Sequence, residues 1–202
     1  MSLYNLIAAG HNGQCFALLA RRFMIGEPQA ARGVRMLLPA LLPGFEAWIE
    51  TRSGMTAFLT QLSRGSYHNL LSSPAMFSNH FERERGLQLI ETLRSAREID
   101  GADLARAVES SGLNYRVLLQ MAPFAALLML AAIRTASERP MREIVMQRFG
   151  ERLRPSSDPF ADLVELLALE AKSDQHSHFA QLLNGLLSRT TSAPTSISAH
   201  PA

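Results

Sequence analysis

The hydrophobic positions recur with the period of an amphipathic α-helix along most of the chain. In FADLVELLALEAKSD, the apolar residues from Phe160 to Leu167 follow the i, i+3, i+4, i+7 spacing of one helix face. Asp158 precedes this run as an expected N-cap. Similar apolar faces occur in GLQLIETLRSAR, at 86–97, and in HFAQLLNGLLSR, at 178–189. No alternating five-residue run bounded by turns predicts a strand, so the pattern predicts an all-α fold.

Interruptions in the pattern predict where the helices stop. The serine-rich segment 63–80 is expected to be a loop with one or two short helical turns. SERP, at 137–140, is expected to end the preceding apolar helix, because the residue before a proline disfavours the helical conformation. From these interruptions we predict a helical domain over 1–135, a C-terminal helical extension over 136–189 and a disordered tail over 190–202.

Two stretches of the chain resemble each other. LARRFMIGEPQAARGVRMLLPALLPGF starts at Leu19, and LARAVESSGLNYRVLLQMAPFAALLML starts at Leu104. Each has an amphipathic helix, a short break and a long apolar helix interrupted by proline. The resulting prediction is a helical bundle of about seven to nine helices, built from two pseudo-repeated helical hairpins plus C-terminal helices.

Two apolar stretches, 36–49 and 117–133, need a hydrophobic environment. The second is bracketed by Arg116 and Arg134, but its length as a helix is roughly 26 Å, short of the ~30 Å hydrocarbon core of a bilayer. We therefore favour a protein core or a subunit interface over a membrane span. The candidate interface residues are Leu37, Leu38, Leu41, Leu42, Phe45, Trp48, Met121, Phe124, Leu127 and Leu128.

Composition and charge narrow the class of protein. The 202 residues are 47% hydrophobic, which is typical of a globular protein. Their net charge is +2, which is too small to indicate general binding of nucleic acid. The segment 134–154 is rich in arginine, and the helix after residue 157 is rich in acids. These charges could pair between adjacent helices, remain as two solvated faces, or meet an anionic partner. No signal peptide is recognisable, so a cytoplasmic location is expected.

The sequence contains no recognisable catalytic constellation. Cys15 is the single cysteine, which excludes an internal disulfide, and we interpret it as a small buried residue rather than a reactive thiol. His11 is near it in sequence, but a catalytic pair depends on geometry. His176 and His178 would point to opposite sides of a helix, and Asp174 with His178 is better read as a solvated pair than as half a metal site. We predict no enzyme, no cofactor and no metal.

Several segments carry a resemblance to a known family. They are LLPALLPG at 37–44, GLQLI at 86–90, LARAVESSGLN at 104–114 and the Met-Ala-Pro that starts at Met121. Over residues 1–135 the chain resembles the bacterial domain of unknown function 937 family, which is related to YidB-like proteins. The resemblance implies an all-α, oligomeric fold and implies no activity.

These observations favour a non-enzymatic, self-associating helical module for interaction or scaffolding. The expected partners are a second copy, with a dimer as the first expectation, and an unknown protein. Two alternatives stay open: a membrane-associated protein anchored through 117–133, and a weak nucleic-acid binder that uses 134–154.

Overall fold

The computed structural model describes residues 2–65, 67–77, 80–96, 112–149 and 156–169. Within these ranges every regular element is a helix, which confirms the predicted all-α bundle. The predicted tail at 190–202, the helix at 178–189 and the start of the second repeat unit lie outside the described residues.

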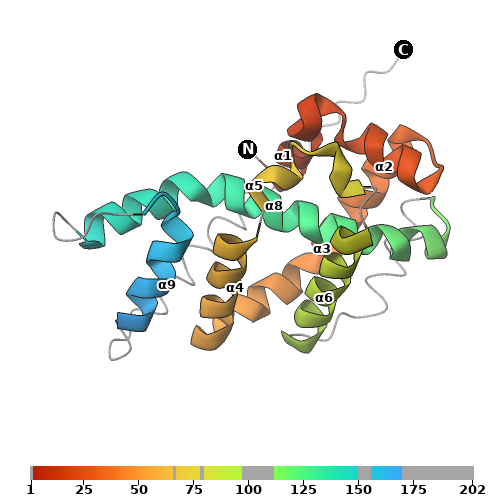
Figure 1. Cartoon of the computed structure of the whole chain (residues 1–202). Helices are drawn as coiled ribbons and strands as arrows, with labels where there is room; N and C mark the ends of the chain where they lie inside the picture. The colour runs from red at the N-terminus through yellow and green to blue at the C-terminus, as the bar shows by residue number, and fades with distance from the viewer. Residues whose placement is uncertain (1, 66, 78–79, 97–111, 150–155, 170–202) are drawn as a thin grey trace, which may run out of the picture.

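Figure 1 shows the order of the described helices along the chain. In chain order they are α1 (Leu3–Ala9), the 3-10 helix η1 (Gly10–Gly13), α2 (Cys15–Phe23), α3 (Glu27–Glu50), α4 (Arg52–Arg64), α5 (Tyr67–Leu70), the 3-10 helix η2 (Pro74–Phe77), α6 (His80–Ala96), α8 (Tyr115–Phe149) and α9 (Pro159–Leu169). The short turns α5 and η2 confirm the prediction for the serine-rich segment.

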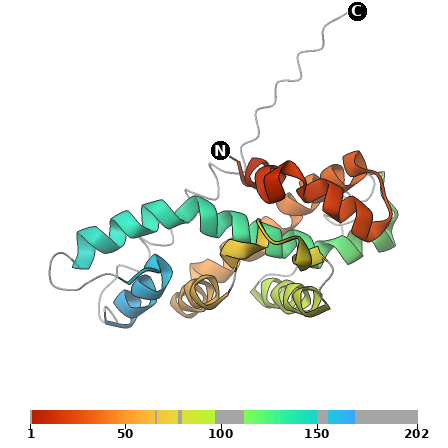
Figure 2. The same cartoon turned by 45° about the horizontal axis from the view of Figure 1, so that its top comes forward.

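The long helix α8 runs through the middle of the bundle. Figure 2 shows α1 and α2 on one side of it, and α4, α6 and α9 on the other. Its residues from Met121 to Ile133 are all buried, so this stretch is apolar on every side because other helices surround it. The hydrophobic core is therefore organised around α8.

The predicted helix end at 137–140 is wrong, because α8 continues through Pro140 to Phe149. A proline inside a helix removes one backbone hydrogen bond and costs about 3 kcal/mol. Met141 and Val145, each 1% exposed, follow the proline and anchor the next turns in the core. The predicted boundary between 135 and 136 thus falls within one continuous helix, and α9 packs against both α4 and α8.

Glycines lie where α3, α6 and α8 meet in pairs. A Cβ atom on Gly86 of α6 would lie 2.5 Å from the backbone oxygen of Pro123 on α8. One on Gly44 of α3 would lie 3.0 Å from Cβ of Leu93 on α6. Gly33 of α3 faces α8 and the turn that precedes α8. There, the atoms nearest to an added Cβ would be the ends of flexible side chains. The three helices therefore approach one another at positions that carry no side chain.

Substitution of these glycines should have graded effects. Gly86→Ala should lower the free energy of unfolding by about 1–3 kcal/mol, because its methyl group would meet backbone that cannot move without separating α6 from α8. Gly33→Ala should be close to neutral, since the ends of Leu113 and Met121 can shift and alanine gains about 1 kcal/mol of helix propensity. Urea denaturation of both variants checks this order, and equal effects would contradict it.

Candidate functional site

Most of the ten candidate interface residues lie inside the chain rather than on its surface. Eight are buried: Leu37, Leu38, Leu41, Phe45, Met121, Phe124, Leu127 and Leu128. Leu42 and Trp48 are half-buried. Their ring contacts are intramolecular: Trp48 packs edge-on against Phe58 at 5.3 Å, and Phe124 contacts Phe23 at 5.7 Å between ring centroids. The stretches 36–49 and 117–133 are thus brought together with α4 and α2 in one core, which leaves the eight buried side chains unavailable to a partner in this structure.

The membrane candidate occupies the same core. By length and composition, the part of α8 from Tyr115 to Gln147 could cross a membrane, because its most apolar 18-residue window has a mean hydropathy of 1.9. However, 78% of its most apolar window is buried inside the protein. A core helix of a globular protein has these same properties, so the apolar character of α8 is accounted for by the helices packed around it.

His11 and Cys15 do not form a catalytic pair in this structure. Cys15 is fully buried, and burial raises the pKa of its thiol to about 12. The thiolate is the nucleophilic form of cysteine, so this thiol is unreactive near neutral pH. The side chain of His11 is also buried, and neither of its ring nitrogens makes a hydrogen bond of good geometry among the described residues.

No metal centre is found in the part of the chain that the structure describes. There, no group of three or more His, Cys, Asp or Glu residues is placed to hold a metal ion. The pair Asp174 and His178, together with His176, lies beyond the described residues.

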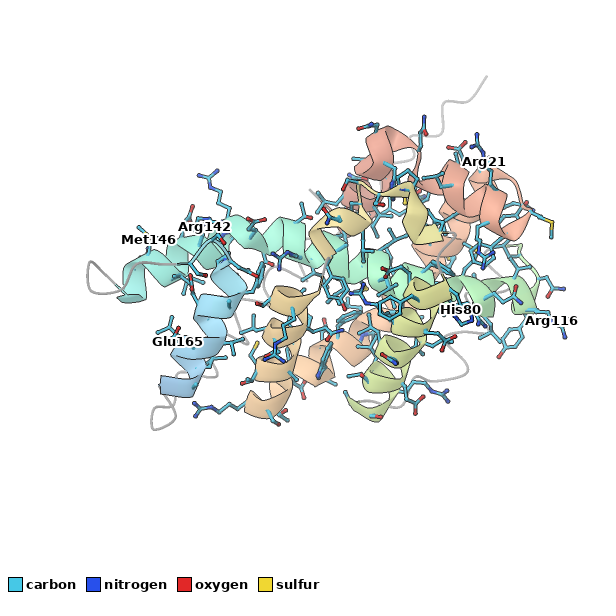
Figure 3. All side chains as sticks on the ribbon, in the orientation of Figure 1. Arg21, His80, Arg116, Arg142, Met146 and Glu165 are labelled. Carbon is cyan, nitrogen blue, oxygen red and sulfur yellow. The ribbon has the colours of Figure 1, made fainter. Side chains whose placement is uncertain are left out.

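The described arginines of the 134–154 segment are mostly paired with acids of the same helix. Arg139 contacts Glu143 at 3.1 Å, and Arg142 contacts Glu138 at 3.2 Å. Figure 3 shows Arg142 at the opposite end of the molecule from Arg21 and Arg116. The described part of this segment therefore presents charges of both signs, which is unlike the cationic stripe of a nucleic-acid-binding helix.

Arg134 is the exception, because its side chain is buried between three helices. One of its terminal nitrogens donates a hydrogen bond to the carbonyl of Leu62 at the end of α4. The other lies 3.5 Å from the carboxylate of Asp158, just before α9, and the guanidinium stacks over the ring of Phe160 at 4.8 Å. This is a realised ion pair between the arginine-rich segment and the acidic helix. Ion pairing between adjacent helices was one of the alternatives that the sequence left open. The sequence did not indicate that Arg134 would be the arginine that is buried.

The far end of α9 is held in a similar way. Arg52, in the first turn of α4, donates a hydrogen bond to the carbonyl of Leu167 in the last turn of α9. Carbonyls in the last turn of a helix lack partners within the helix, so a cationic side chain satisfies one of them. Arginines thus fix both ends of α9 to the bundle.

Besides Phe81 of α6, which is 65% exposed, three large apolar side chains are exposed on α6 and the first turns of α8, and the sequence interpretation missed them. Leu87 is 38% exposed, Tyr115 53% and Leu119 40%. Tyr115 and Leu119 are four residues apart and share a helix face with Pro123, which contacts Gly86 of α6. Leu87 directly follows Gly86, so these exposed groups flank the crossing of the two helices.

Arg85 indicates which side of α6 carries Leu87. Its guanidinium stacks on the ring of Tyr67 in α5, at 4.8 Å, and α5 packs against α8. The hydroxyl of Tyr67 accepts a hydrogen bond from Gln61, one residue before the Leu62 that Arg134 contacts. Arg85 therefore faces the middle of α8. Leu87 lies roughly 200° further around α6, on the side of the helix away from Arg85.

Comparisons with known proteins do not assign a family. No protein-family model matches the chain, and neither a curated protein nor a solved structure is significantly similar to it. The resemblance to the domain of unknown function 937 family therefore stays a prediction.

The state of Cys15 can be checked directly, because it is the single thiol of the chain. We expect no reaction with a thiol reagent such as 5,5′-dithiobis(2-nitrobenzoate) at pH 8 under native conditions, because the thiol is buried and protonated. In denaturant one equivalent should react. Rapid labelling of the folded protein would contradict this placement.

Arg134 should contribute strongly to stability. Arg134→Met should lower the free energy of unfolding by about 2–3 kcal/mol, because it leaves the carbonyl of Leu62 and the carboxylate of Asp158 without their partner. The matched control Arg139→Met removes an exposed pair on the same helix and should cost about 0.5 kcal/mol or less. Urea denaturation measures both. Hydrogen exchange should also accelerate in α9 for the first variant alone, and equal effects would contradict the assignment.

Proposed function

We propose that this protein is a non-enzymatic helical module that associates with a second copy of itself. The surface that we assign to this role is the apolar patch formed by Leu87, Tyr115 and Leu119. The observation that carries the proposal is that these exposed side chains belong to two helices whose backbones approach closely at Gly86 and Pro123. Apolar side chains gathered at one place on a rigid surface are typical of interaction sites.

The charges around the patch support pairing with an identical surface. Arg83 and Arg94 lie on the same side of α6 as Leu87, and the exposed Glu91 follows nearby. A two-fold interface brings the same patch of both copies together, so it needs charges of both signs at its rim. Tyrosine and arginine, both present here, are the residue types enriched in such interfaces.

The alternatives have less support. Membrane insertion of 117–133 would require the core helix to leave the side chains that now surround it. Binding of nucleic acid through 134–154 would compete with the ion pairs that Arg139 and Arg142 already make. The burial of His11 and Cys15 is in keeping with a non-enzymatic role.

The test is the mass of the detergent-free protein by light scattering and by analytical ultracentrifugation, over roughly 1–100 μM, a range in which interfaces of modest size dissociate. We expect a dimer that the double variant Tyr115→Ser, Leu119→Ser converts to a monomer. Met146→Ser is the matched control, because Met146 is equally exposed on the other half of α8.

A wild-type protein that stays monomeric at the highest concentration would overturn the proposal. A dimer that resists the double variant would place the interface elsewhere. Aggregation that only detergent or lipid relieves would favour the membrane alternative.

A further inference from the structure

The turn between α1 and α2 has an unusual backbone. Three consecutive residues in it have positive φ angles: His11 at 54°, Asn12 at 57° and Gly13 at 82°. Residues other than glycine disfavour this left-handed region, which costs roughly 1–2 kcal/mol for each of them. The turn therefore needs contacts with the rest of the protein to keep this shape.

Those contacts are made with the segment that links α5 to η2. The backbone N–H of His11 donates a hydrogen bond to the carbonyl of Leu71, with 2.6 Å between the two atoms. A Cβ on Gly10 would lie 3.2 Å from a methyl carbon of Leu71, which shows how closely the two segments approach. The imidazole of His11 packs against the ring of Phe77, with 5.3 Å between centroids. His11 is thus the residue through which the turn is docked.

The side chain of His11 sits in a place without a counter-charge. It is 7% exposed, and its ring nitrogens make no hydrogen bond of good geometry among the described residues, although the backbone oxygens of Leu70 and Ser72 lie near them. Residues 1–26 and 66–77, which supply the turn and the segments packed on it, contain no Asp or Glu. A positive charge on this ring would therefore be buried with no carboxylate from these segments to balance it.

The other titratable groups near the turn are neutral or positive. Tyr4 is the titratable side chain of α1, and α2 carries Cys15, Arg21 and Arg22. The segment 67–77 contributes Tyr67 and His68. On α8, which packs against α1 and α5, the described acids are Glu138 and Glu143, and each pairs with an arginine of its own helix.

We propose that His11 is a pH-sensitive latch, which in its neutral form keeps the α1–α2 turn docked on residues 67–77 and releases the turn when it is protonated. Release lets His11 and Asn12 leave the left-handed region and removes the cover from Leu71 and Phe77. Phe77 also stacks on Phe124 of α8, at 6.2 Å between centroids, so the release reaches the central helix.

The direction in which the pKa of His11 is shifted agrees with this geometry. Burial lowers the pKa of His11 below its ordinary 6.5, and the backbone oxygens of Leu70 and Ser72 oppose this lowering only in part. Because the folded form holds the proton less tightly than the unfolded chain, the docked state is fully stable above about pH 6.5 and loses stability as the pH falls below it.

The first experiment compares the pH dependence of unfolding in three proteins. Between pH 7.5 and 5.5, the unfolding equilibrium constant of the wild type should rise by an additional factor that His11→Asn lacks. The upper limit of this factor is about 10, which applies when the folded form stays unprotonated over the whole range. Asparagine tolerates the left-handed region and carries no charge at either pH. His80→Asn is the matched control, because His80 is exposed and lies 3.8 Å from Glu84, so this variant should keep the extra factor.

The second experiment needs no variant. Hydrogen exchange of the wild type, corrected for the intrinsic effect of pH, should accelerate between pH 7.5 and 5.5 in peptides that cover residues 9–14 and 67–77, and should change less in α4. An identical pH dependence in wild type and His11→Asn, or exchange at 9–14 that does not respond to pH, would overturn the proposal.

Discussion

The close approach of α6 to α8 at Gly86 and Pro123 is the contact on which the rest of the bundle depends. It lets the backbones of two helices touch, and Gly44 does the same for α3 and α6. Side chains in a protein interior are packed as densely as in a crystal, so a small increase in one helix separation would loosen the neighbouring contacts too. With these helices in place, α8 has apolar neighbours on all sides. The second half of α8 then binds α9 through the buried side chain of Arg134.

The features that were predicted correctly from the sequence are those that depend on residues close together in the chain. The helical period, the start of α9 after Asp158 and the short turns between 63 and 80 all follow from spacing and from turn residues. The prediction that a helix ends at 137–140 was wrong because it considered only the local effect of one proline. Burial of Met141 and Val145 beyond it, a tertiary contribution, outweighs one lost hydrogen bond.

The candidate site could be predicted only in part, because its features depend on which helices meet. Apolar runs such as 36–49 mark a need for burial, but the pattern does not distinguish a core from an interface between copies. Arg134 was visible as a charge beside an apolar run, yet its burial follows from the positions of Leu62 and Asp158. The roles of Gly86 and His11 cannot be recognised from neighbouring residues in the sequence. Gly86 approaches Pro123 and His11 binds Leu71, and both of these partners lie far along the chain.

The position of α8 in the chain also shapes how the protein is made. α1 and α3 both pack against α8, which is synthesised after the first 114 residues. At roughly 5–20 residues per second, a ribosome leaves the apolar face of α3 without one of its packing partners, α8, for several seconds. During that time the nascent chain exposes the stretch from Met36 to Ile49, so its folding yield depends on what shields this stretch until the central helix emerges.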